Sequence, residues 1–265
     1  MKTLKTAVIQ LHATSNKSEN IKRAVFLVQQ AIRRQAEFIL LPEIFVFRGR
    51  WTGLDIEEIA EEIPGESIAP LMALARRHKV FILAGSIFEK SKAAKKVYNT
   101  SVLINDRGDI VCKYRKRHLF DANIGGKRIR ESDQFVAGTK SVMARIKGFE
   151  VGLSICFDLR FSELYREYAF LGAQVLCVPS AFTHQTGKAH WEILLRARAV
   201  ENFCYVLAPN QAGKDSRGIR CYGHSMIVDP WGKILARASA NKAEVIFANL
   251  DRKTLKRRRS SLSVK

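Results

Sequence analysis

Short apolar segments of strand length recur throughout this chain, and they constrain its fold more than any other feature of the sequence. Each is too short for a typical helix, and length is the main criterion that separates a buried strand from a buried helix. Further pairs of such segments flank turn sequences at Asn105–Gly108, Lys147–Gly148 and Asp229–Gly232, and so predict β-hairpins. The other predicted strands are Thr6–Leu11, Phe38–Leu41, Val80–Phe88, Val175–Val178, Tyr205–Ala208 and Glu244–Asn249.

Segments with helical periodicity alternate with these strands. Between Ile21 and Ile32, apolar residues recur at the spacing of one helix face, and Asn16 with Glu19 has the pattern of a capping box at the helix start. Further helices are predicted at Pro70–His78, Phe161–Leu171 and His190–Asn202. Helices between strands, with hairpins among them, predict layered α/β packing with two mixed sheets between helical layers.

Length and composition limit the class of protein. The 265 residues show no internal repeat or flexible linker, so residues 1–265 are expected to form one domain with a large core. No apolar run reaches the roughly 18 residues of a membrane span, and the N-terminus lacks the apolar core of a secretory signal. The five cysteines form no C-x-x-C pair, which argues against a disulfide framework or zinc site and favours the cytoplasm.

The formal net charge of +20 is high for this length, and basic residues cluster between Arg252 and Arg259. Three explanations stay open: a solvated surface, attraction of anionic substrates to a cleft, or loose binding of nucleic acid. No nucleic-acid-binding motif accompanies the charge, so we expect no specific nucleic-acid partner.

Three polar residues follow predicted strands: Glu43, Lys116 and Cys156. In open α/β sheets, sites lie just beyond the carboxyl ends of strands, so an acid, a base and a thiol could share one cleft. Each also has a simpler explanation, as a surface carboxylate, part of a solvated basic run, or a buried core thiol. Cys156 precedes the predicted helix Phe161–Leu171, and the positive potential near a helix N-terminus favours a thiolate.

The three polar residues lie in the segments Leu41–Glu43, Tyr114–Asp121 and Cys156–Leu164. These segments resemble the signature motifs of the nitrilase superfamily of carbon–nitrogen hydrolases. Further matching segments are Pro179–Phe182, Gly187–Glu192, Arg196–Ala199 and Tyr222–Gly232. The resemblance therefore covers almost the whole chain. The later segments look most like those of the amidases that hydrolyse deaminated glutathione, with the ω-amidases as close relatives.

This resemblance implies both a fold and a site. The implied fold is an α/β four-layer αββα sandwich with two mixed β-sheets, assembled as a homodimer or a higher homo-oligomer. The implied site has Glu43, Lys116 and Cys156 as a catalytic triad, with Glu131 as a second glutamate beside it. The family chemistry requires no metal and no cofactor.

The reaction implied by the resemblance is amide hydrolysis through a covalent intermediate. The Cys156 thiolate attacks the carbonyl carbon, while Glu43 serves as general base toward the thiol and then as acid toward departing ammonia. The Lys116 ammonium and the backbone N–H of Phe157 are expected to stabilise the oxyanion. Water activated by Glu43 then hydrolyses the thioester, and Glu131 holds Lys116 in place.

The expected partner is a small-molecule amide that carries negative charge. Basic side chains near the motifs are candidate ligands for its carboxylates: Lys127, Arg128, Arg130, Arg217 and Arg220. Deaminated glutathione is the first choice on resemblance, and a small dicarboxylic monoamide, the substrate of an ω-amidase, is the second. A catalytically silent binding protein with the same fold is the alternative class, although an intact Glu–Lys–Cys set argues against it.

Overall fold

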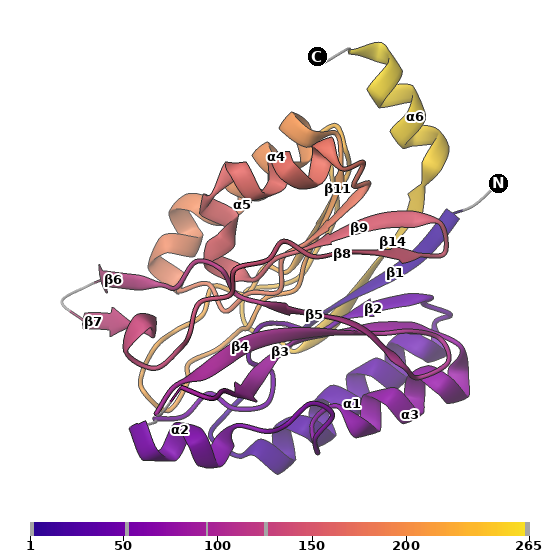
Figure 1. Ribbon diagram of the computed structural model, residues 1–265. Helices are drawn as coiled ribbons and strands as arrows, with labels where there is room; N and C mark the ends of the chain where they lie inside the picture. The colour runs from indigo at the N-terminus through magenta and orange to yellow at the C-terminus, as the bar shows by residue number, and fades with distance from the viewer. Residues whose placement is uncertain (1–2, 51–52, 94, 125–126, 263–265) are drawn as a thin grey trace.

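Two six-stranded β-sheets lie face to face in the computed structural model, which describes residues 3–50, 53–93, 95–124 and 127–262 (Figure 1). The order in the first sheet is β14 (Glu244–Asp251), β1 (Thr3–Gln10), β2 (Phe38–Leu40), β3 (Phe81–Lys90), β4 (Val97–Ile104) and β5 (Ile110–Arg115). Strands β1, β2 and β3 are parallel, and the remaining pairings are antiparallel. The first sheet is therefore mixed.

The second sheet has the same mixed character. Its order is β13 (Ile234–Arg237), β12 (Met226–Val228), β11 (Tyr205–Ala208), β10 (Val175–Cys177), β9 (Phe149–Leu153) and β8 (Met143–Ile146). Strands β9, β10 and β11 are parallel, while β8 and β12–β13 pair antiparallel. The predicted hairpins are confirmed as β4–β5, β8–β9 and β12–β13. A separate ribbon joins β6 (Asp121–Ile124) to β7 (Lys127–Arg130).

Helices cover the outer face of each sheet. Helices α1 (Lys17–Arg33) and α3 (Ala69–His78) lie on the first sheet, and α4 (Ser162–Phe170) and α5 (His184–Asn202) lie on the second (Figure 1). Buried apolar residues form one core under each helical layer and one between the sheets. The predicted four-layer αββα sandwich is therefore confirmed. The remaining helical elements are α2 (Gly53–Ile59), α6 (Arg252–Ser261), and the 3-10 turns η1 (Glu131–Asp133) and η2 (Cys156–Arg160).

The start of α1 shows how local sequence sets an element. The Asn16 side chain accepts the Glu19 N–H at 3.0 Å, as predicted for an N-cap, and such a cap stabilises a helix by about 1 kcal/mol. The reciprocal half of the capping box is absent, because the Asn16 N–H donates to Thr14 Oγ1 and the Glu19 carboxylate pairs with Arg23. The prediction of a complete box was wrong because both groups have nearer partners.

Helix α5 begins at His184 rather than at the predicted His190. Its first turn is polar and contains Gly187, so it lacks the apolar periodicity that marks a helix. The glycine has a packing reason, since a Cβ there would lie 2.4 Å from the Tyr222 Cγ. Helix α6 and the β6–β7 ribbon were not predicted either. In α6, Leu255 is the one residue buried among the described positions, so no periodic pattern exists to detect.

The strands that precede Glu43, Lys116 and Cys156 end at the same end of the sandwich. Strand β5 runs in the direction of β2 because two antiparallel steps through β4 restore that direction. Strands β9 and β10 are parallel to each other, so their following loops also share one end. A hydrogen bond from the Ala181 N–H, after β10, to Glu43, after β2, joins the two sheets there. This end therefore positions the candidate site.

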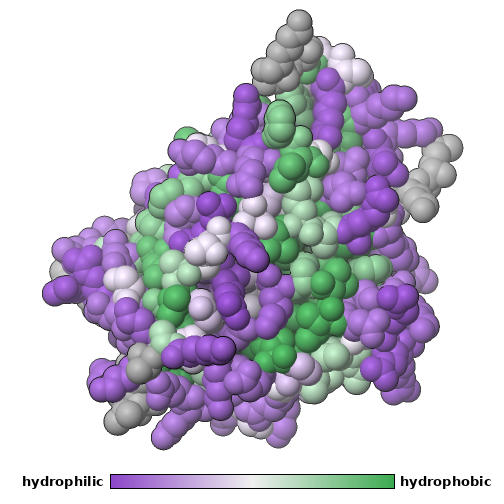
Figure 2. All heavy atoms as spheres, viewed as in Figure 1, coloured by the Kyte–Doolittle hydropathy of each residue, from purple (hydrophilic) through white to green (hydrophobic). Residues whose placement is uncertain are grey.

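The surface carries both hydrophilic and apolar areas. On the face shown in Figure 2, hydrophilic residues cover the margins and apolar residues are seen mainly in the middle. Among the helices of the described residues, none has the length and apolar character required to cross a membrane.

Candidate active site

Cys156 lies in a strained turn directly after β9. Its φ of 47° falls in the left-handed region, which costs energy for a residue with a Cβ and which is frequent at functional sites. Its N–H donates to the Pro179 carbonyl, after β10, at 2.9 Å. Cys156 also begins η2, so the N–H of the next residue, Phe157, belongs to the first turn, where amides have no acceptor within the helix.

Asp158 joins this turn to the end of β5. Its buried Oδ2 accepts the Ile155 N–H at 2.9 Å and the Tyr114 hydroxyl at 2.7 Å. Its Oδ1 accepts the His118 N–H at 3.0 Å and lies 2.7 Å from the His118 Nδ1. Burial and the charge of Asp158 raise the pKa of Tyr114 well above its usual value, so this hydroxyl remains a donor. Residues on both sides of Lys116 are thereby fixed to the cysteine turn.

Lys116 lies between two carboxylates. Its Nζ donates to Glu43 at 2.9 Å and to the two oxygens of Glu131 at 2.8 and 3.0 Å, and only 1% of the residue is exposed. Burial would lower the pKa of Lys116, but Glu131 and Glu43 outweigh burial and hold it well above its usual value. Burial also raises the pKa of Glu131, with Lys116 opposing and Glu43 adding to the effect. The ammonium is therefore permanently charged and cannot act as a base.

The two carboxylate oxygens of Glu43 have different partners. Oε1 accepts from Lys116 Nζ and from Asn99 Nδ2, each at 2.9 Å. Oε2 accepts the Ala181 N–H at 2.8 Å, and the Cys156 thiol is close enough to this carboxylate to lower its pKa. Burial would raise the pKa of Glu43, but Lys116, the thiol and Asn99 together lower it. The carboxylate is therefore ionised and in contact with the thiol.

The thiol of Cys156 is protonated at rest, which contradicts the expectation that a helix N-terminus would favour its thiolate. Burial and the charge of Glu43 raise its pKa well above the usual value, and Lys116 and the Ala181 N–H offset this only in part. A short 3-10 helix also supplies only a small dipole. Formation of the thiolate therefore requires a base, and Glu43 is in position to be that base.

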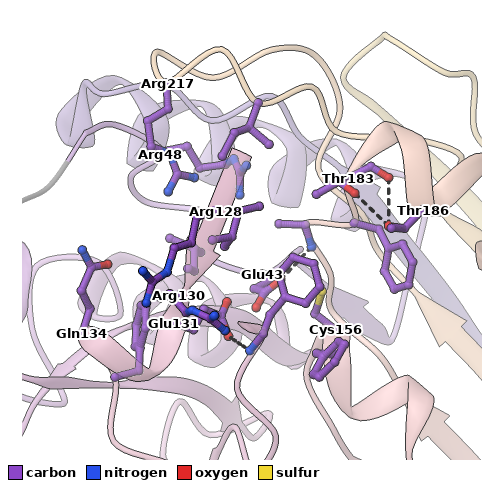
Figure 3. A pocket seen from close by; sticks show the side chains of 18 of the residues that line it. Glu43, Arg48, Arg128, Arg130, Glu131, Gln134, Cys156, Thr183, Thr186 and Arg217 are labelled. Carbon is purple, nitrogen blue, oxygen red and sulfur yellow. Dashed lines mark hydrogen bonds between the residues drawn. The ribbon is translucent and has the colours of Figure 1, made fainter. Parts of the chain in front are cut away.

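These groups open into a cavity of about 750 Å³ that Glu43, Glu131 and Cys156 line (Figure 3). The cavity is also rich in arginine, with Arg48, Arg50, Arg128, Arg130, Arg160 and Arg217 in its lining. Figure 3 shows one wall formed by Arg48, Arg128, Arg130 and Arg217, and Thr183 and Thr186 on the opposite side. One wall of the cavity is therefore strongly cationic.

The predicted substrate ligands have different outcomes. Those that line the cavity are Arg128, Arg130 and Arg217. Arg220 does not belong to the lining within the described residues, because its guanidinium donates to Asn241 at 3.2 Å. The neighbouring Ile219 lines the cavity instead. The side chain of Lys127 lies outside the described part of the chain.

Sequence reasoning missed several residues that shape the site. Arg48 and Arg50 lie in the loop after Glu43, so closeness in sequence was the one available signal. Arg160 ends η2, within the motif that Cys156 begins, and also went unnoticed. Asn99 lies within β4, and its contact with Glu43 exists only because β2, β3 and β4 pair in one sheet.

The arrangement has the components of acyl-transfer chemistry. A thiol can serve as nucleophile, an ionised carboxylate can take its proton, and an ammonium with a backbone N–H can receive developing negative charge. Within the described residues, no cluster of three or more His, Cys, Asp or Glu side chains could hold a metal ion.

Comparison with known proteins identifies the class to which this fold and site belong. The sequence matches the carbon–nitrogen hydrolase family over residues 5–260, so the chain belongs to that family. It is 42% identical to a deaminated glutathione amidase of Synechocystis sp., over 99% of this chain and 97% of that protein. It is 38% identical to omega-amidase NIT2 of Homo sapiens, over 100% of this chain and 94% of that protein.

A solved structure shows the same fold. The C. elegans NitFhit protein superimposes with a TM-score of 0.91 at 36% identity and covers 98% of this chain. This chain spans 63% of that longer protein. The family membership expected from the sequence motifs is therefore confirmed.

Proposed function

We propose that this protein hydrolyses an amide bond through a thioester on Cys156. The main support is that the Cys156 thiol and the ionised Glu43 carboxylate line one cavity, with the Lys116 ammonium hydrogen-bonded to Glu43 behind them. The two relatives described above carry the names of amidases, which supports the same reaction class.

In the first half-reaction, Cys156 Sγ attacks the amide carbonyl carbon while its proton passes to Glu43. A C–S bond forms, and the carbonyl π electrons move to the oxygen. Lys116 Nζ and the Phe157 N–H stabilise this oxyanion, and the loss of one such donor commonly raises a barrier by about 3–4 kcal/mol. When the oxyanion collapses, the C–N bond breaks and the amine leaves with the proton from Glu43.

In the second half-reaction, water attacks the thioester carbon while Glu43 takes a proton from it. A C–O bond forms, the C–S bond breaks, and the proton passes from Glu43 to sulfur as the carboxylic acid leaves. The raised pKa of the Cys156 thiol favours this return of the proton to sulfur. Glu131 keeps Lys116 oriented throughout, because both of its oxygens hold Nζ.

The cationic wall supports an anionic substrate. Arg128, Arg130 and Arg217 line the same cavity as Cys156, so they can form charge-assisted hydrogen bonds to substrate carboxylates. Deaminated glutathione is our first choice because of the size of the cavity and the name of the Synechocystis relative. A small dicarboxylic monoamide is the second. Hydrolysis of the monoamide would release ammonia, whereas hydrolysis of deaminated glutathione would release a dipeptide with a free amino group.

The test is a panel of amides, including deaminated glutathione, with both ammonia and free amine measured. We expect turnover by the wild type and an acyl adduct on Cys156 after acid quench, detected by intact-mass spectrometry. The control Cys156→Ala should show no adduct and lose at least about 10⁴-fold in kcat. No product from any amide and no adduct would instead favour a silent binding protein, and salt-sensitive binding of DNA or RNA would favour a nucleic-acid role.

We also propose that the protein forms a homodimer or a higher homo-oligomer through the outer side of α4 and α5. Phe170 at the end of α4 is 92% exposed and Ile193 in α5 is 66% exposed, and Leu171 after α4 and Val200 in α5 are exposed too. A second copy is the proposed partner, because one apolar surface can face its own copy across a two-fold axis. A reducing cytoplasm is the proposed location, since Cys156 reacts only as a free thiol.

A further inference from the structure

A buried ion-pair cluster lies in the wall of the cavity. Arg48 Nη2 donates to Asp215 Oδ2 at 3.0 Å, and Arg217 donates to the same oxygen through Nε at 3.1 Å and Nη2 at 2.8 Å. The other oxygen of Asp215 accepts the N–H groups of Arg217 and Ile219 at 3.0 and 2.9 Å. A single carboxylate oxygen therefore holds two guanidinium groups.

The three side chains of this cluster carry one net positive charge. Arg48 is only 5% exposed, yet both arginines line the cavity, and Figure 3 shows them close together at its wall. Burial and the charge of Arg48 lower the pKa of Arg217 despite Asp215. Arg48 is buried and the Arg217 side chain is 25% exposed, so one anion offsets two cations that are wholly or partly removed from water. An anion that enters the cavity would offset the remaining cost.

The position of Arg48 places its charge near the reacting groups. Its N–H donates to the Thr14 carbonyl at 2.8 Å, so the backbone is fixed in the loop that begins at Glu43. Burial would lower the pKa of Arg48, but Cys221, Asp215 and Glu43 outweigh burial and raise it. Arg48 and Cys156 line the same cavity, so a short substrate can contact both.

We propose that Arg48 is the receptor for a carboxylate on the acyl part of the substrate. This rests on the proposed amidase function and narrows the substrate class to monoamides of dicarboxylic acids. Deaminated glutathione and a small ω-amide share such an acyl group, so one receptor serves both. Asp215 is a positioning residue that fixes the Arg48 guanidinium, and Arg217 adds a second cation beside it.

The experiment compares two amides of equal chain length, glutaramate with its carboxylate and valeramide without it. We expect Arg48→Gln to lower the ratio of kcat/KM for glutaramate over valeramide by about 10- to 100-fold, the effect of losing a charged hydrogen bond. Arg23→Gln, which removes an exposed cation from α1, is the matched control and should leave the ratio unchanged. An equal loss on both amides would show a merely structural role and overturn the proposal.

A second variant tests Arg48 in case the single variant misfolds. A binding measurement tests Arg48 without relying on catalysis. Arg48→Gln/Asp215→Asn keeps one net positive charge in the cluster and should still lower the same ratio. An unchanged ratio would overturn the proposed role of Arg48. Glutarate should bind the Cys156→Ala protein in calorimetry, and added Arg48→Gln should weaken it about 10-fold or more. Binding through Arg48 with no amide hydrolysed by the wild type would support the receptor and refute the amidase. If glutarate binds equally well with and without Arg48→Gln, the proposed role of Arg48 as carboxylate receptor is refuted.

Discussion

At the scale of single residues, each oxygen of the Glu43 carboxylate has its own donors, and this division decides which oxygen can exchange a proton. Lys116 and Asn99 occupy Oε1, so the oxygen that accepts the Ala181 N–H is the one left to serve the thiol. The Asn99 Oδ1 is buried without a hydrogen-bond partner in the described part of the chain. A buried unpaired acceptor is costly, which indicates that Asn99 is held for its bond to Glu43.

Replacement of Asn99 should therefore change the pH dependence of catalysis. Glu43 has a lowered pKa and acts as a base only when ionised, so activity is present above that pKa and is lost as pH falls through it. Asn99→Leu removes a donor, raises the pKa of Glu43, and should move the acid limb of the kcat/KM profile to higher pH, with about a 10-fold loss at the optimum. The isosteric Asn99→Asp should move it further, because it adds negative charge. An acid limb that stays in place in both variants would contradict this role.

At the scale of elements, a charged cluster on Glu89 fixes β5 to β3 and β4. Its carboxylate accepts from Lys113 Nζ at 2.7 Å, from Arg115 at 2.7 and 3.0 Å, and from Thr100 Oγ1 at 2.7 Å. Lys116 follows Arg115 directly, so the same cluster helps to fix the position of the Lys116 backbone. The cluster links sheet packing to the geometry of the site.

This cluster should make stability depend on pH. Burial would raise the pKa of Glu89, but bonds from Arg115, Lys113 and Thr100 lower it from 4.5 to about 2. A lowered carboxyl pKa stabilises the fold above pH 4.5, and that contribution disappears as pH falls to about 2. Glu89→Gln should lower the free energy of unfolding by about 2 kcal/mol at neutral pH, as measured by urea denaturation. The difference between wild type and variant should vanish near pH 2.

The control for Glu89→Gln is Glu19→Gln, which removes an exposed ion pair on α1. Exposed pairs of this kind contribute little, so we expect a loss of less than about 0.5 kcal/mol at any pH. A constant difference between wild type and Glu89→Gln across the acid range would show that the ionisation of Glu89 does not contribute.

At the scale of the whole molecule, the exposed apolar side of α4 and α5 predicts self-association. Light scattering after gel filtration should give a mass of two or more 30.0 kDa chains. Phe170→Glu/Ile193→Glu should shift the mass to one chain, because buried charges without partners oppose association. Val111→Glu, at an exposed apolar position on β5, is the matched control and should leave the mass unchanged. A wild type that is monomeric at micromolar concentration would refute the proposed interface.

Much of the architecture could be predicted because strand and turn signals are local. The predicted segment Tyr205–Ala208 coincides with β11. The turn at Asn105 forms as expected, with the Gly108 N–H donating to the Asn105 carbonyl at 3.0 Å. Predictions failed where a distant residue decided the outcome, as at the start of α5, where Tyr222 packs on a polar helical turn.

The sequence alone determined most of the strands and helices of the two sheets and their helical layers, and it placed a carboxylate, an ammonium and a thiol after strands. Backbone preference and hydrophobic period operate over a few residues, so they can be read without the fold. Only the tertiary structure decided that Arg48 rather than Arg220 lines the cavity, and that the Cys156 thiol keeps its proton. Those outcomes depend on burial and on contacts between segments as far apart as Glu43 and Ala181, whose energies exist only once the sheets have packed.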